Sequence, residues 1–416
     1  MSRDVRLILA AQALRAFAYG AGAVLLGVTL DQSGFSSTEV GAVLASVVAG
    51  TVLASIAIGR FADRWTRRRC YAGLYGALGL VGVAYATTDR LWLLVLAGLT
   101  GAMSTEVVES GPFTSLEQAM LATDGTGRDL MRHFSVYNAV ATAAGSLGAL
   151  AAGGVGPLRH AWPHAPRDQA IFWVFVPVAL VGVAIASHLS AAIEPRPAPS
   201  REARPSSTLA RSRPAVLRLS ALFAADSFGG GFVVQAFLAY WLSTKFGASV
   251  ATLGVVFFMV GVLQTLSMLA APRVAARVGL LSTMVFTHLP SNVLLIAIAF
   301  APNLPIAVAL LLGRVVLSQM DVPTRQAYVM ALVDPDEQTA AAAYTNTARY
   351  VVRPAGPALA GASQALALGA PFVIGGAIKS FYDVVLWRWF RTVDVPLDAV
   401  RLSTAKPATE PREVSA

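Results

Sequence analysis

The sequence contains a single cysteine and few charged residues. Cys70 has no second cysteine with which to form an intramolecular disulfide, and an isolated cysteine gives little support to a reactive role. Charged residues make up 13% of the chain, whereas a soluble domain has roughly 25%. Because 56% of the residues are hydrophobic, the chain lacks the polar residues needed to cover a soluble fold. We therefore predict an integral membrane protein.

The chain also lacks the residue patterns of the common enzyme classes. Its five histidines are scattered, and it contains no Cys/His metal spacing, phosphate-binding loop or nucleophile elbow. No polar segment is long enough for the nucleotide-binding domain of an ATP-driven pump. We expect neither an enzyme nor a bound cofactor or metal.

Apolar runs recur along the whole chain, and about 20 such residues cross the hydrocarbon core as a helix. The first run carries Arg15 and is too long for a cleavable signal peptide. The sequence predicts an all-α membrane protein with twelve transmembrane helices. They are expected near residues 5–30, 39–60, 70–88, 91–118, 134–156, 170–191, 217–243, 250–271, 281–301, 304–330, 338–365 and 370–391.

The net charge of +9 is unevenly placed between the two sides of the predicted membrane protein. If the N-terminus is cytoplasmic, most basic residues fall on the inside, and only Arg90, Arg159, Arg167 and Lys245 fall outside. Basic residues concentrate on the cytoplasmic side of membrane proteins. We expect both termini in the cytoplasm, no nucleic-acid partner, and a place in the inner (plasma) membrane of a bacterial cell.

A segment rich in Pro, Arg and Ser divides the chain into two halves. It spans residues 194–214 and has too few large apolar residues to bury a core, so we predict a cytoplasmic linker. Six helices precede it in residues 1–193, six follow in residues 215–393, and residues 394–416 form a polar tail.

The two halves resemble each other in sequence. An offset of 208 matches six residues without a gap, and an offset of 211 matches two more around the first and seventh helices. Parallel repeats of this kind are typical of transporters built from two helix bundles. The pairs are Ser110/Ser318, Gln118/Gln326, Ala119/Ala327, Asn138/Asn346, Gly148/Gly356, Gly153/Gly361, Phe17/Phe228 and Gly20/Gly231.

The loop after the second predicted helix, Gly59 to Arg68, reads GRFADRWTRR. It resembles the signature loop of the major facilitator superfamily, in its drug-exporter form, except that Thr66 replaces the usual second glycine. The resemblance implies two pseudo-symmetric six-helix bundles.

It also implies that Gly59 permits close approach of a helix from the other half and that Asp63 accepts hydrogen bonds at the start of the eleventh helix, near Gln338. Arg64, Arg67 and Arg68 are expected to pair with acids such as Glu117 or Asp124 and to latch the outward-facing state. The alternative is that these arginines only set the topology.

We single out twelve of the ionisable residues inside the predicted spans. Each costs roughly 3 kcal/mol at the bilayer centre, so they must pair, face water or lie near the interfaces. They are Arg15, Glu106, Glu109, Glu117, Asp226, Arg314, Asp321, Arg325, Arg349, Arg353, Lys379 and Asp383.

In the major facilitator superfamily, which this sequence resembles, the first, fourth, seventh and tenth helices line a central cavity. The resemblance therefore suggests a substrate and ion pathway between these helices. We expect repeat-related opposite charges to face each other across the pseudo-two-fold axis, with Glu117 and Arg325 forming a cytoplasmic gate. Either Asp226 or Glu109 is our candidate for proton coupling, and a static salt bridge is the alternative. The predicted pathway residues are Gln12, Arg15, Tyr19, Glu106, Glu109, Asp226, Gln235 and Arg314.

These features predict a secondary active transporter that moves a small organic solute by alternating access, coupled to protons, with export favoured over import. The expected partners are a small-molecule substrate, protons and the lipid bilayer, and the chain is expected to act as a monomer. An importer of a sugar or organic anion is one alternative, and a non-transporting sensor or scaffold on the same fold is another.

The latch hypothesis predicts the effect of neutralising the signature-loop acid. Asp63→Asn should lower the transport rate about two- to fivefold, because a carboxylate at a helix start is worth about 0.3–1 kcal/mol. Membrane insertion should be unchanged. Flux in proteoliposomes measures this effect, and an unaltered rate would refute the latch.

Overall fold

The computed structural model describes residues 1–105, 111–121, 123, 128–154, 169–194, 209, 211–334 and 337–393, without the side chains of 61–64, 128–132 and 338–339. Among these residues there are helices and no strands. The first half contains α1 (Arg3–Gln32), α2 (Ser37–Trp65), α3 (Arg67–Thr87), α4 (Leu91–Leu99), α5 (Pro112–Leu121), α6 (Arg128–Gly153), η1 (Gln169–Val174), α8 (Phe175–His188) and η2 (Ala191–Ile193). The second half contains α9 (Arg213–Gly231), α10 (Gln235–Phe246), α11 (Val250–Val278), α12 (Leu280–Ala299), α13 (Leu304–Ser318), α14 (Asp321–Leu332), α15 (Gln338–Val352), α16 (Ala355–Leu366) and α17 (Ala370–Phe390).

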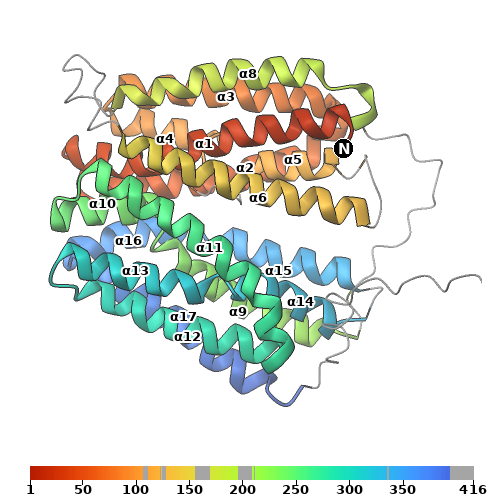
Figure 1. The fold of residues 1–416 in the computed structure, drawn as a ribbon, viewed down its shortest axis with the longest axis vertical. Helices are drawn as coiled ribbons and strands as arrows, with labels where there is room; N and C mark the ends of the chain where they lie inside the picture. Colours follow the sequence, from red (N-terminus) through yellow and green to blue (C-terminus); the bar gives the residue numbers. More distant parts are fainter. Residues whose placement is uncertain are drawn as a thin grey trace, which may run out of the picture.

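The helices form two packed groups, α1 to α8 and α9 to α17, which lie side by side (Figure 1). Within the described residues, 10 helical segments are long and apolar enough to cross a membrane. The other two predicted spans, 91–118 and 338–365, coincide with the divided pairs α4/α5 and α15/α16. Each is broken into helices too short to span alone, so the structure agrees with the twelve predicted transmembrane segments.

Several spans are interrupted near their middle, and glycine or proline accompanies the breaks. The helix α9 ends in Gly229, Gly230 and Gly231 before α10 begins, and Pro354 separates α15 from α16. Proline removes a backbone donor and clashes with the preceding turn, while glycine lowers helix stability. Irregular backbone at membrane depth is tolerated where it lies against protein or a wet cavity. We therefore expect these breaks to lie against protein or beside a water-filled space between the two groups.

Repeat-related glycines pack in related ways within the two halves. A Cβ added to Gly148 would overlap the backbone of Phe17, so α6 lies directly against α1. In the second half, a Cβ on Gly231 would lie 2.9 Å from the Cα of Gly356, where α9 meets α16. The sequence repeat thus corresponds to a repeated close approach of helices, which small residues permit in membranes.

The two groups touch each other mainly through α1 with α10, α2 with α16 and α6 with α11. These contacts gather at the end opposite to the N-terminus, which we name the far end (left in Figure 1). Gly41 meets the backbone of Gly361 there, with 2.9 Å from its added Cβ to the Cα. Asp31 accepts hydrogen bonds of 2.7 Å from both Ser243 and Thr244. The far end is therefore closed by backbone packing and by a polar contact between the halves.

The close approach expected at Gly59 is not found. A Cβ added to Gly59 would meet no described atom within 4 Å. The same helix α2 instead makes its close approach at Gly41, on the far end. The prediction was wrong for this conformation because the two halves meet at the far end and not beside the signature loop.

We predict that a methyl group at Gly20 destabilises the protein. The Cβ of Gly20→Ala would overlap the backbone carbonyl of Gly145, which cannot turn away as a side chain would. Overpacking of this kind costs about 1–3 kcal/mol. Thermal unfolding of the purified protein measures the effect.

The matched control is Gly73→Ala, in the exposed part of α3, where an added Cβ meets no described atom within 4 Å. This change should be neutral or stabilising by up to about 1 kcal/mol, because alanine is the better helix former. Equal melting temperatures for the two variants would contradict the close packing of α1 against α6.

Candidate functional site

A buried ion pair lies at the centre of the N-terminal group. Arg15 on α1 and Glu117 on α5 are both 0% exposed, and the two guanidinium nitrogens lie 2.5 and 2.7 Å from the carboxylate oxygens. Tyr71 and Tyr137 donate further hydrogen bonds to Glu117, at 2.5 and 2.6 Å. The carboxylate thus has both oxygens satisfied, as a buried charge requires.

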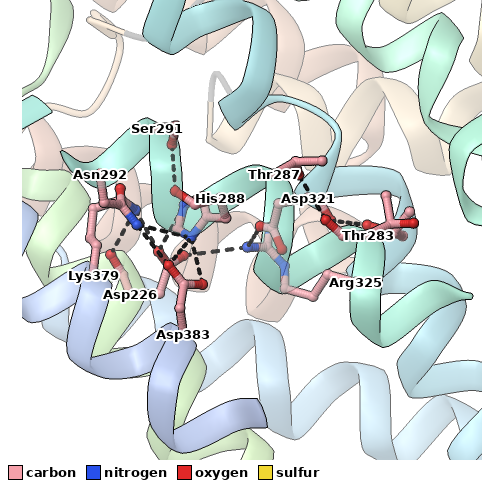
Figure 2. Close-up of polar contacts among 11 residues, drawn as sticks. Asp226, Thr283, Thr287, His288, Ser291, Asn292, Asp321, Arg325, Lys379 and Asp383 are labelled. Atoms are coloured by element: carbon pink, nitrogen blue, oxygen red, sulfur yellow. Dashed lines mark hydrogen bonds and ion pairs between the residues drawn. The ribbon is translucent and has the colours of Figure 1, made fainter. Parts of the chain in front are cut away.

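A larger network of charges lies in the C-terminal group (Figure 2). Asp226 on α9 contacts the ammonium of Lys379 on α17 and lies 3.4 Å from Arg325 on α14. Arg325 also contacts Asp321, at 2.8 Å. All four side chains are buried. Arg325 therefore bridges Asp226 and Asp321, and Lys379 is a second basic partner that neutralises Asp226.

A histidine connects this network to a third carboxylate. His288 on α12 places Nε2 3.7 Å from Asp226 and Nδ1 2.9 Å from Asp383 on α17. Asn292 donates a 2.8 Å hydrogen bond to Asp383. Asp383 is 0% exposed and contacts no Lys or Arg of the described residues. His288 therefore stands between a cavity-lining acid and a fully buried one (Figure 2).

The predicted pairing across the two halves is wrong in this structure. Glu117 was expected to meet Arg325, and Arg15 to lie opposite Asp226, but each charge pairs within its own half. The offsets that align the halves explain the result. Arg15 aligns with Asp226 and Glu117 with Arg325, so the same two positions form an ion pair in both halves, with the charges exchanged.

A first cavity of about 290 Å³ lies between the halves and borders the C-terminal network. Among the predicted pathway residues, Asp226, Gln235 and Arg314 line it. Its wall also includes Lys379 and His288 and apolar side chains such as Phe257. The volume is at the lower end of the roughly 300–1,000 Å³ that small-molecule sites occupy.

A second cavity of about 530 Å³ shares part of its wall with the first, including Thr142 and Met268. Two pairs of repeat-related polar residues line it, Gln118 with Gln326 and Asn138 with Asn346, and all four are exposed. They come from α5, α6, α14 and α15, which lie toward the N-terminal end (Figure 1). Exposed amides inside membrane spans indicate that this space admits water.

Three other predicted pathway residues, Gln12, Arg15 and Tyr19, are buried and line neither cavity. Gln12 accepts a hydrogen bond from Arg15, and the hydroxyl of Tyr19 donates to the carbonyl of Ala102. The prediction that these three residues line the pathway is therefore wrong for this conformation. Glu106 and Glu109 lie outside the described residues.

Two arginines of the signature loop, Arg67 and Arg68, have described partners that were not among those expected. Arg67 donates to the carbonyls of Ala119 and Ile193, at 2.9 and 3.0 Å. Arg68 lies 3.4 Å from Glu194, which also accepts from both backbone amides at the start of α3. Glu117 is not among these partners, because Arg15 already occupies it. Asp124 and the side chains of Asp63 and Arg64 lie outside the described part of the chain.

Sequence reasoning missed several members of these clusters. Tyr71 and Tyr137 occupy apolar helices and resemble ordinary core residues. His288 and Asn292 are spaced one helical turn apart, and His288 lies in a span without any other charged residue. The isolated His288 could have been identified as a candidate functional residue from the sequence, because an ionisable group at membrane depth is a functional candidate by default.

The contact at the far end predicts a shift in conformation. Asp31→Ala removes the acceptor for Ser243 and Thr244, and hydrogen bonds to a charged group contribute about 1.5–3 kcal/mol. The population open at the far end should therefore rise about tenfold or more. Spin labels at Ser33→Cys and Ser249→Cys, in a Cys70→Ser background, report the distance between the halves.

Asp89→Ala is the matched control, because Asp89 accepts a hydrogen bond from Gln169 within its own half. It should leave the distance distribution unchanged. Identical distributions for Asp31→Ala and the parent would show that the contact does not hold the far end closed.

Comparison with known proteins agrees with this architecture. Residues 8–357 match the family model described as Major Facilitator Superfamily. A curated relative, the uncharacterized membrane protein YJR124C of Saccharomyces cerevisiae, is 24% identical over 95% of this chain and 96% of its own length.

Solved transporters share the fold at low sequence identity. The nucleoside transporter NupG superposes with a TM-score of 0.70 and 16% identity, over 94% of this chain and 98% of its own. The inward-open xylose transporter XylE from E. coli gives 0.69 and 12%, over 96% and 99%. A bacterial homolog of the human lysosomal transporter Spinster, inward-facing, gives 0.68 and 14%, over 98% and 100%. With a family model that covers most of its length, this chain belongs to the major facilitator superfamily and is a transporter of some solute.

Proposed function

We propose that this protein is a proton-coupled secondary transporter that moves a small organic solute by alternating access. The observation that carries the proposal is the buried acid and histidine network on the wall of the first cavity. A solute bound in that cavity would lie against His288, which shares the proton with Asp383 behind it.

The cavities supply the route for the solute. The halves pack at the far end, while exposed Gln and Asn side chains line the space toward the N-terminal end. If the termini are cytoplasmic, this is an inward-facing arrangement, the conformation named for the XylE and Spinster-homolog structures. Reorientation would then require the contacts of Asp31 and Gly41 to part.

The surroundings of Asp383 support proton binding in the C-terminal network. Asp383 is buried and contacts His288 and Asn292, with no Lys or Arg of the described residues in contact. One proton shared by His288 and Asp383 would neutralise this carboxylate, and an uncompensated charge at this depth is costly. Histidine is the side chain that most readily gains and loses a proton near neutral pH.

We retain Asp226 as part of the coupling site because it lines the cavity and lies beside His288, a member of the proton-carrying pair. It contacts His288 on one side and Lys379 on the other, and it lines the cavity. A solute that displaces Lys379 or Arg325 from Asp226 would change the proton affinity of the Asp226 carboxylate. A static salt-bridge network is the competing explanation, and the next experiment separates the two.

The proposal includes export as the direction of transport, which rests on the drug-exporter-like loop from Gly59 to Arg68. Transport assays with an imposed pH gradient of either sign read the direction directly.

Asp383→Asn should abolish uphill transport and leave solute exchange intact. A neutral side chain at this position cannot exchange a proton, while the cavity wall keeps its shape because Asp383 does not line it. Solutes that stabilise the purified protein against heating are tested in proteoliposomes, first for accumulation under a pH gradient and then for exchange at equal pH.

The control is Asp334→Asn, a carboxylate that pairs with Arg211 at the surface and should affect neither assay. Loss of both accumulation and exchange in Asp383→Asn would indicate a static structural role. Accumulation unchanged in Asp383→Asn, in Asp226→Asn and in His288→Gln would remove the coupling proposal altogether.

A further inference from the structure

We propose that the first cavity binds an organic anion and that Arg314 is the residue that holds its negative charge. This inference rests on the proposed transport function and deepens it, because it names the class of solute. It depends on one basic side chain in the cavity wall whose charge no described residue neutralises by contact.

Arg314 lies on α13 and lines the first cavity. It forms no hydrogen bond or ion pair with any described residue, and its Nε atom is buried without a partner. The charge of Asp226 acts on it through space, but Asp226 is in contact with Lys379 and Arg325. Arg314 is half-buried, and a buried guanidinium nitrogen without an acceptor is costly, so an external anion in the cavity would supply the missing acceptor.

A hydroxyl one helical turn away has the same property. Ser318 lies four residues after Arg314, on the same face of α13, and its Oγ is also buried without a hydrogen-bond partner among the described residues. Both side chains line the first cavity. Two unsatisfied polar groups of one helix face thus border the same space, and a carboxylate or phosphate oxygen would satisfy both.

The other walls of the cavity suit the remainder of such a molecule. Gln235 on α10 and Gln264 on α11 line it without any hydrogen bond to a described residue. Phe257, Val260 and Leu311 provide apolar surface. The described acids in the wall, Asp226 and Asp321, already contact basic partners. The site therefore favours a small acid with an apolar body over a cation or a sugar.

The first test measures binding with matched charged and neutral probes. Benzoate, 4-phenylbutyrate and hexanoate, and their primary amides, are titrated against the purified protein while its melting temperature is followed. We expect at least one acid to raise the melting temperature with a saturable dose dependence and its amide to have no effect. If no acid stabilises the protein, or if acid and amide act equally, the inference is overturned.

The second test assigns the charge to Arg314. Arg314→Gln should weaken binding of the stabilising acid about 10- to 100-fold, the range for a charged hydrogen-bonded contact. Arg314→Lys, which keeps the charge, should retain most of the affinity, and Ser318→Ala should lose less than Arg314→Gln. Arg277→Gln, an exposed residue at the end of α11, is the charge-matched control.

The failures of the two proposals are distinguishable. Acid binding that depends on Arg314 but drives no flux in proteoliposomes would refute transport and keep the anion site. Flux of neutral or cationic solutes, with no response to any acid, would refute the anion site and keep transport. Acid binding that is unchanged in Arg314→Gln would place the anion elsewhere and overturn the assignment.

Discussion

An ionised side chain can remain inside a membrane only with a partner of opposite charge or with water, and this constraint organises the molecule. Each half solves it with an ion pair at the same two repeat-related positions, Arg15 with Glu117 and Asp226 with Arg325. The N-terminal pair is sealed by tyrosine hydroxyls and has no exposure to the cavities. The C-terminal pair is joined by two further acids, Asp321 and Asp383, a lysine and a histidine, and it borders the space between the halves.

Because of this asymmetry, we assign different roles to the charged clusters of the two halves. The N-terminal pair is saturated with hydrogen bonds, so separating it would leave buried charges without partners, at about 3–5 kcal/mol for a broken pair. It serves best as a fixed brace that joins α1 to α5. The C-terminal network has several partners at comparable distances, so one contact can be exchanged for another. A network of that kind suits a site that binds and releases ions and solutes.

The fold was predictable from the sequence because the membrane imposes a local rule. Every stretch of apolar residues long enough to span must be a helix, and the predicted runs agree with the observed helices to within a few residues at most of their ends. The breaks at Gly231 and Pro354 interrupt spans that were predicted as continuous, although glycine and proline are residue types that disfavour a helix interior. The repeat offsets correctly related positions in the two halves, including the glycines where helices approach closely.

The pairing of charges was not predictable in the same way. Alignment shows that Arg15 and Asp226 are equivalent, but equivalence places them in the same position of separate halves and does not bring them together. Which residue a charge meets depends on the packing of α1 against α5 and of α9 against α14 and α17, which no local pattern encodes. The role of His288 depended on Asp383, 95 residues away along the chain. Arg314 was named as a pathway residue from its depth, and the structure adds that no described residue is in hydrogen-bond or ion-pair contact with it.

Transport by this route requires a water-accessible crevice between the halves, and labelling of introduced cysteines tests for it directly. The single native cysteine is replaced by Cys70→Ser, and Asn346→Cys is compared with Leu266→Cys, an exposed apolar position of α11 that lines neither cavity. A membrane-impermeant maleimide should label Asn346→Cys rapidly from the side that carries the N-terminus and leave Leu266→Cys unlabelled in the bilayer. An Asn346→Cys variant that resists the reagent from both sides would contradict the crevice, and with it the proposed solute pathway.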